Sequence, residues 1–207
     1  MASLKRNNYF FKEVKILEGN IGYLDFRKFR EPEYGIETVV SAMGFLSNTD
    51  AIIIDLRNNG GGSPNMVQFI CSYFFKDESV HLNSIYKRMP DVPLYILTSN
   101  RTFSAAEEFS YNLQKLNRAV IIGETTGGGA HPGGRIKATN KFNVWTPTAR
   151  SINPITNSNW EGIGVVPDIN IPANEALIEA HLEALDSLKR VNTDAESKEY
   201  YLSLIHI

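Results

Sequence analysis

Three short apolar runs constrain the fold of this sequence more than any other feature. They cover residues 51–54, 94–97 and 119–122, and each ends in a turn of glycine or small polar residues. Continuous apolar runs of this length are typical of strands buried on both faces of a parallel sheet. Helical patterns follow the first two runs, and this alternation predicts an α/β layer architecture.

The rest of the sequence predicts the helices and the outer strands of this architecture. Apolar residues at helical spacing follow Glu33, Pro64 marks a helix start, and Ser104 begins a further helix that reaches about Leu116. A long amphipathic helix is expected near the carboxyl end, and a Thr-x-x-Glu pattern at 193–196 predicts a capping box after it. The expected strands are 20–26, 51–54, 94–97, 119–122, 142–146 and 165–169, and the long helix is 173–190.

Composition places the chain among ordinary globular proteins. It has 207 residues, of which 43% are hydrophobic and 21% charged, so one packed domain is expected. The net charge of -2 provides no broad basic footprint for nucleic acid. No apolar stretch approaches the roughly 20 residues that span a bilayer, and no signal-peptide core follows Met1. The chain as written therefore reads as cytoplasmic, or as exported or periplasmic if a leader precedes it.

Metal and cofactor chemistry find no support in the motifs. The histidines at 81, 131, 181 and 206 lie too far apart for metal-ligand spacing, and no Walker A, G-x-G-x-x-G or G-x-S-x-G motif occurs. We therefore predict no metal and no cofactor. Cys71 lies in an apolar run and is expected to be a buried, inert thiol. His181 falls on the apolar stripe of its helix, where a packed, hydrogen-bonded histidine is the expected role.

Two turns place free backbone N–H groups at helix entrances, one after residue 57 and one at Ser104. A helix start favours developing negative charge, so Ser104 is a candidate nucleophile. Serine is also a preferred N-cap residue, and this simpler role stays open from spacing alone.

Three ordered motifs resemble the tail-specific, or C-terminal-processing, serine peptidase family. They are Ile54-Asp55-Leu56-Arg57-Asn58-Asn59-Gly60-Gly61-Gly62, then Leu97-Thr98-Ser99-Asn100-Arg101-Thr102-Phe103-Ser104-Ala105-Ala106-Glu107, then Gly123-Glu124-Thr125-Thr126-Gly127-Gly128-Gly129. The segments 129–132 and 159–168 look most like its branch related to interphotoreceptor retinoid-binding protein and tricorn-like proteases. The resemblance spans roughly 20–188 and implies a crotonase/ClpP-like core of stacked ββα units with flanking helices.

The resemblance implies roles for individual residues. It makes Ser104 the nucleophile that forms an acyl-enzyme with a polypeptide substrate. The backbone amides of Gly62 and Ala105 would form the oxyanion hole. Glu161 matches the glutamate that orients a catalytic histidine in the tricorn-like branch, although an acid in a solvated turn would look the same.

The general base departs from the family pattern. The lysine of the lysine-dependent branch would stand 25 residues after Ser104, where this chain has Gly129. The histidine of the other branch lies upstream, and this chain has no histidine before His81. Either an amino-terminal region is missing, or another residue substitutes. His131 is the nearby candidate, because histidine exchanges protons near neutral pH; a structural or substrate-contacting role is the alternative.

These observations divide the chain into three parts. We expect a linker over 1–19, a tail-specific-protease catalytic domain over 20–190, and a carboxyl-terminal extension over 191–207 whose last residues, His206 included, look artefactual. The stretch between Gly62 and Ser104 is shorter than the family usual, with 76–92 as the expected contraction and His81 as an exposed residue within it.

Two functions compete at this stage. The first is a serine endopeptidase that hydrolyses polypeptides, with a homo-oligomer compatible with the sequence. The second is a non-catalytic module on the same fold that binds a hydrophobic ligand such as a retinoid or fatty acid. The absence of both the lysine and the upstream histidine favours this second function. Acyl-CoA chemistry on this type of fold rests on analogy alone.

Overall fold

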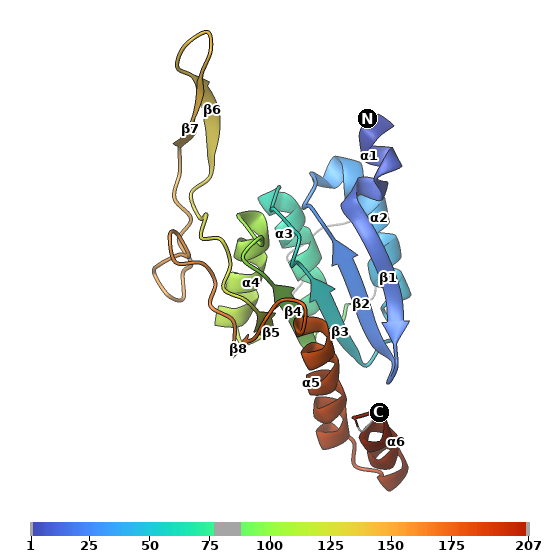
Figure 1. The fold of residues 1–207 in the computed structure, drawn as a ribbon. Coiled ribbons are helices and arrows are strands. Elements are labelled where there is room, and N and C mark those ends of the chain that lie inside the picture. Colours follow the sequence, from blue (N-terminus) through green and yellow to red (C-terminus); the bar gives the residue numbers. More distant parts are fainter. Residues whose placement is uncertain (1, 77–87, 206–207) are drawn as a thin grey trace.

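A mostly parallel six-stranded sheet forms the body of the molecule (Figure 1). The computed structural model describes residues 2–76 and 88–205. β1 pairs antiparallel with β2, and each later neighbouring pair is parallel. In spatial order the strands are β1 (Phe11–Leu17), β2 (Ile21–Phe26), β3 (Ala51–Asp55), β4 (Leu94–Thr98), β5 (Val120–Gly123) and β8 (Ile169–Asn170).

Helices cover both faces of this sheet. One apolar core lies between the sheet and α2, α3 and α4, and a second lies between the sheet and α5 and α6. The α-helices are α1 (Ala2–Arg6), α2 (Pro32–Phe45), α3 (Pro64–Cys71), α4 (Ala105–Lys115), α5 (Ala176–Val191) and α6 (Ala195–Ile205). Two short 3-10 turns are η1 (Asn8–Phe10) and η2 (Ser72–Phe74).

Alternation along the central strands explains the double burial. In β3, Ile52 and Ile54 enter the first core while Ala51 and Ile53 enter the second, and all four are 0% exposed. A strand with apolar neighbours on both sides reads as an uninterrupted apolar run. The predictions of buried strands at 51–54, 94–97 and 119–122 are therefore confirmed.

The strand expected at 165–169 is wrong over 165–168, because only Ile169 and Asn170 join the sheet. The backbone N–H and C=O of Val165 are bonded instead to Thr126 in a neighbouring loop, at 2.7 and 3.2 Å. Pro167 has no N–H to donate to a ladder. This segment therefore supports the glycine-rich loop after β5 before it reaches the sheet.

Strand β1 lies within the range expected to be a linker, 1–19. Phe11 is buried and stacks on Phe26 with ring centroids 5.2 Å apart. In the expected extension, α6 packs on α5 and buries Tyr201. The capping-box prediction is wrong in its residue: Asp194, rather than Thr193, accepts the hydrogen bond from the Ser197 N–H at 2.7 Å.

The remaining predictions about isolated residues have mixed outcomes. His181 Nε2 lies 2.8 Å from the carbonyl oxygen of Glu18, which confirms its packed, hydrogen-bonded role. Cys71 is a free thiol that is partly rather than fully buried, and burial raises its pKa, as expected of an unreactive cysteine. His81, His206 and most of the expected contraction lie outside the described residues.

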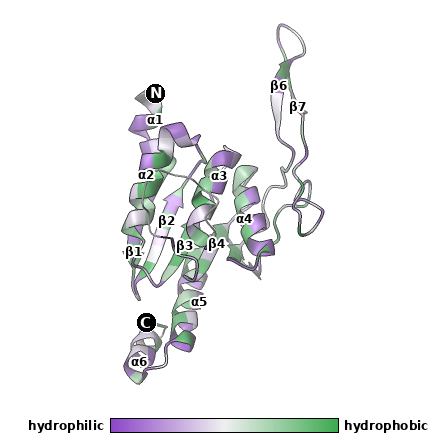
Figure 2. Cartoon of the chain, turned by 180° about the vertical axis from the view of Figure 1, so that it is seen from behind, coloured by the Kyte–Doolittle hydropathy of each residue, from purple (hydrophilic) through white to green (hydrophobic). Residues whose placement is uncertain are grey.

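A two-stranded antiparallel hairpin, β6 (Gly133–Lys137) and β7 (Asn143–Pro147), projects from the body on the side of α4 (Figure 1). We call residues 133–147 the arm. Figure 2 shows hydrophobic colour on the arm as well as on the central strands. Within residues 2–76 and 88–205, no helix has the length and apolar character needed to cross a bilayer.

Candidate active site

Three loops meet where β3, β4 and β5 end. Thr102, after β4, donates its hydroxyl to the Leu56 carbonyl at 2.8 Å, and the Phe103 N–H bonds the Asn59 carbonyl at 3.1 Å. The Gly127 N–H, after β5, bonds the Thr102 carbonyl at 3.0 Å. Carboxyl ends of adjacent parallel strands share one edge of a sheet, which is where α/β proteins commonly place their sites.

Ser104 occupies a strained backbone conformation at this junction. Its φ of 55° and ψ of -123° lie in a region that non-glycine residues rarely adopt, and Ser104 is the residue immediately before α4. Such a conformation costs on the order of 1–3 kcal/mol and persists only where the surroundings enforce it. A sharp strand-to-helix turn with this strain is how serine hydrolases present a nucleophile, even though no G-x-S-x-G sequence is present.

The two predicted oxyanion donors flank this serine. Among the described residues, the backbone N–H groups of Gly62 and Ala105 have no hydrogen-bond acceptor. Gly61 makes their approach feasible: its φ is +88°, and a Cβ there would lie 2.8 Å from both the Ala105 nitrogen and the Ser104 Cβ. The turn that carries Gly62 therefore lies against Ser104 and Ala105 at Gly61, and the N–H groups of Gly62 and Ala105 stay unpaired within the described residues.

The buried carboxylate of Glu107 holds the Ser104 turn in place. It is 0% exposed and accepts four hydrogen bonds, which come from two segments of the chain. The donors are Ser104 N–H at 2.7 Å, Thr126 Oγ1 at 2.6 Å, Gly128 N–H at 2.6 Å and Gly129 N–H at 2.9 Å. Charge-assisted bonds to backbone N–H groups and the start of helix α4 both stabilise a carboxylate there.

Sequence reasoning missed the role of Glu107. The signal was available, because Ser104-Ala105-Ala106-Glu107 has the S-x-x-E spacing of a capping box, in which the glutamate bonds the N-cap N–H. What the spacing does not reveal is that the same carboxylate also holds the glycine loop about 20 residues further along the chain.

His131 and Glu161 lie beside each other at the far end of that loop. Glu161 Oε2 accepts hydrogen bonds from the N–H groups of Ala130 at 2.6 Å and His131 at 3.1 Å. The other oxygen, Oε1, is 3.8 Å from His131 Nδ1. The structure thus joins the two residues, and among the described residues no hydrogen bond links His131 to Ser104.

Gly129 connects the two halves of the site. Its N–H bonds Glu107, and its carbonyl accepts a bond from the buried Trp160 indole at 3.2 Å. A Cβ at Gly129 would lie 2.1 Å from a ring carbon of Phe103. A lysine at this position would have to displace that ring, which gives a physical reason for the departure from the lysine-dependent pattern.

A second buried polar cluster supports the turn that carries Gly62. Asp55 is 3% exposed and accepts bonds from the Tyr23 hydroxyl at 2.7 Å and from Arg57 Nη2 at 2.6 Å. Burial alone would raise the pKa of Asp55, but the hydrogen bonds from Arg57 and Tyr23 outweigh it and lower that pKa. Burial and the bond to Asp55 raise the pKa of Tyr23, so its hydroxyl stays a donor.

The fold places the chain in the ClpP/crotonase-like α/β class, to which serine peptidases of family S41 belong. Residues 20–171 match the model of peptidase family S41, and the chain belongs to this family. CtpA-like serine proteases of Staphylococcus epidermidis and Staphylococcus saprophyticus are both 25% identical to it. The alignments cover 81% and 84% of this chain but only 37% and 39% of those relatives.

Solved structures agree on the fold. The D1 C-terminal processing protease of photosystem II superposes with a TM-score of 0.58 at 22% identity, covering 76% of this chain and 45% of that one. The tricorn protease gives a TM-score of 0.62 at 20% identity, covering 82% of this chain and 18% of that one. The crotonase/ClpP-like fold is confirmed, while the resemblance to the retinoid-binding branch stays a prediction.

Replacing Glu107 by Gln should lower the free energy of unfolding by about 3 kcal/mol, because an amide nitrogen in place of one oxygen leaves two buried N–H donors without an acceptor. Urea denaturation monitored by circular dichroism measures this. The matched control is Glu108→Gln, one residue along the same helix, whose carboxylate accepts no hydrogen bond from the described residues, so no loss is expected. Equal behaviour of the two variants would contradict the role of Glu107.

Asp55→Asn should destabilise the protein by about 3 kcal/mol at pH 7, since it leaves the half-buried Arg57 without its counter-charge. The folded pKa of Asp55 is depressed, so its contribution is present above the unfolded pKa, near 3.9, and is lost as the pH falls through the folded value. The difference between the variant and the wild type should therefore shrink below pH ~4. Urea denaturation between pH 7 and 3 tests this, with exposed Asp50→Asn as the control; a constant difference would contradict it.

Proposed function

We propose that this chain is the catalytic domain of a serine endopeptidase, with Ser104 as the nucleophile. The observation that carries the proposal is the strained Ser104 turn beside two backbone N–H groups without acceptors. Such N–H groups are what a tetrahedral intermediate needs, and removing one oxyanion donor typically costs ~10²- to 10³-fold in turnover. The chain spans well under half the length of its curated relatives. The activity of the whole protein is therefore proposed together with the role of Ser104.

The chemistry balances with the groups at hand. Ser104 Oγ would attack the carbonyl carbon of a peptide bond while its proton passes to the His131 imidazole. The carbonyl oxygen becomes an anion held by the N–H groups of Gly62 and Ala105. Collapse of this tetrahedral intermediate breaks the carbon–nitrogen bond, and the departing amine takes the proton from the imidazolium. Water, deprotonated in the same way, then hydrolyses the acyl-enzyme and restores Ser104.

Assignment of His131 as the base draws on its pairing with Glu161. A carboxylate beside one ring nitrogen favours the tautomer that leaves the other nitrogen free to accept a proton, and it stabilises the imidazolium. The 3.8 Å separation is longer than a hydrogen bond, and catalytic bonds commonly tighten when substrate binds. The polypeptide substrate follows from family membership, whereas the binding module for a hydrophobic ligand is not favoured by the comparisons.

Ser104→Ala should abolish covalent labelling by a fluorophosphonate and hydrolysis of unfolded polypeptides, because it removes the attacking oxygen. The melting temperature should change little, since the hydrogen bond to Glu107 comes from the Ser104 backbone N–H, which the substitution keeps. Intact-mass measurement and peptide mapping locate the label, with exposed Ser41→Ala as a control that keeps wild-type labelling. Labelling at another residue, or none in a folded wild-type sample, would contradict the nucleophile.

His131→Ala should slow fluorophosphonate labelling by about 10²- to 10⁴-fold, the usual contribution of a general base. His181→Ala is the matched control, because that histidine bonds a carbonyl far from the site and should leave the rate unchanged. Labelling rates of both variants and the wild type are compared at one pH. An unchanged rate in the His131 variant would show that the proton acceptor is another group.

A further inference from the structure

The arm leaves a mixed basic and apolar face uncovered. Register pairs Arg135 with Trp145 and Lys137 with Asn143, so these side chains share one face of the hairpin. Trp145 is 58% exposed, which is unusual for so large an apolar group. A two-stranded hairpin is at best marginally stable by itself in water. The arm therefore has reason to be stabilised by a partner.

Charge indicates the chemistry of that partner. Between residues 125 and 160 the chain has four basic residues and no acidic one, while the rest has 17 basic and 23 acidic residues. The cations of the arm are Arg135, Lys137 and Lys141, and in the described residues none of them forms an ion pair. A surface that combines acidic and apolar side chains would complement this face.

The outer side of α5 is such a surface. Ile178 is 66% exposed and Leu182 is 37% exposed, and their i, i+4 spacing places them on one line of the helix. Glu175, Glu179 and Glu183 flank them, and within the described part of the chain these carboxylates have no ion-pair partner. We call this line, from Glu175 to Glu183, the α5 stripe.

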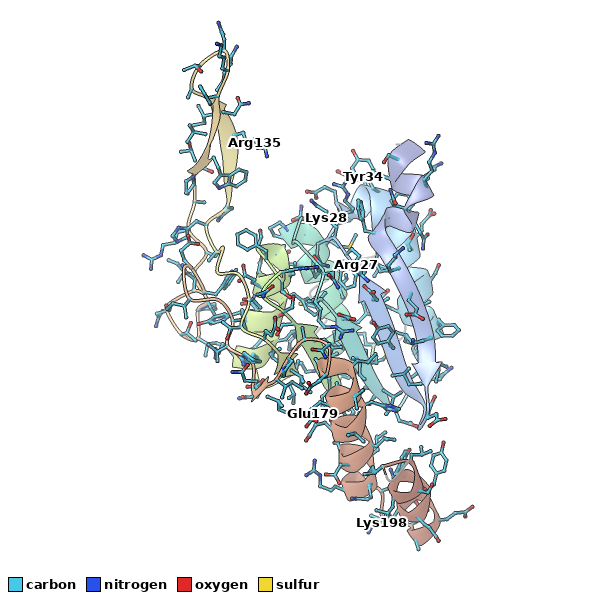
Figure 3. All side chains as sticks on the ribbon, in the orientation of Figure 1. Arg27, Lys28, Tyr34, Arg135, Glu179 and Lys198 are labelled. Carbon is cyan, nitrogen blue, oxygen red and sulfur yellow. The ribbon has the colours of Figure 1, made fainter. Side chains whose placement is uncertain are left out.

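We propose that the arm of one copy binds the α5 stripe of a second copy, reciprocally, in a two-fold symmetric dimer. Trp145 packs on Ile178 and Leu182, and Arg135 and Lys137 bind the flanking glutamates. Figure 3 shows Arg135 on the arm above the sheet and Glu179 on α5 below it, with α6 and Lys198 further down. Two antiparallel copies therefore bring each arm to the other's α5, and the contact forms twice.

Charge reversal tests this pairing because the two contacts are reciprocal. Arg135→Glu/Lys137→Glu places like charges at both contacts of its own homodimer, and so does Glu179→Lys/Glu183→Lys. Each variant alone should show a dimer dissociation constant raised at least about tenfold. In a 1:1 mixture both contacts are again between opposite charges, so heterodimers should form. Sedimentation velocity over a concentration series measures each sample, with Lys198→Glu on exposed α6 as a control that dimerises like wild type.

Three results would overturn the proposal. A wild type that stays monomeric, a dimer insensitive to either charge reversal, or a mixture that remains monomeric would each do so. Circular dichroism checks that every variant is folded before it is compared. If the monomeric wild type instead sediments with vesicles of anionic phosphatidylglycerol, and the arm variant does not, the arm binds lipid and the dimer is excluded.

Discussion

The buried carboxylate of Glu107 is the interaction on which the arrangement of the site depends. An isolated charge is costly to bury, and it persists only where donors surround it. Here the four donors come from the Ser104 turn and from the glycine loop after β5, segments that the chain separates by about 20 residues. Neither segment can shift without leaving buried N–H groups unsatisfied. The strained backbone of Ser104 is therefore enforced by its surroundings, as strain at functional sites generally is.

Asp55 stabilises the opposite side of the site by the same principle. It joins β2 and β3 through the Tyr23 hydroxyl and holds Arg57 at the start of the turn that carries Gly62. Arg57 in turn donates to the carbonyl of Ala173 at 2.7 Å, which ties the segment before α5 to the same edge of the sheet. Apolar burial thus holds the strands, while two buried carboxylates hold the loops between which substrate would lie.

The elements held by apolar burial could be predicted from the sequence, and the contacts that hold the loops could not. The central strands and α2 to α5 could be predicted because double-sided burial and helical spacing leave direct traces in residues such as Ile52, Ile54 and Phe109. Strand β1 could not, since it lies at the sheet edge, consecutive charges at Lys12 and Glu13 interrupt the alternation where the register shifts, and its one buried residue is Phe11. The pairing of Glu161 with His131 was anticipated only through a family resemblance, because nothing local in the sequence links positions 30 residues apart.

The packing around Gly129 limits which side chain the glycine loop can present at that position. A side chain at 129 would meet the ring of Phe103, which is 45% exposed and would have to turn aside. The Phe103 backbone is held separately, by the bond from its N–H to the carbonyl of Asn59 in the turn leading to Gly62. Glu161, meanwhile, binds the N–H groups of both residues that follow Gly129, which sets the direction in which His131 leaves the loop. Packing against Phe103 at Gly129 and the bonds of Glu161 to the next two residues thus act together on which side chains the glycine loop presents.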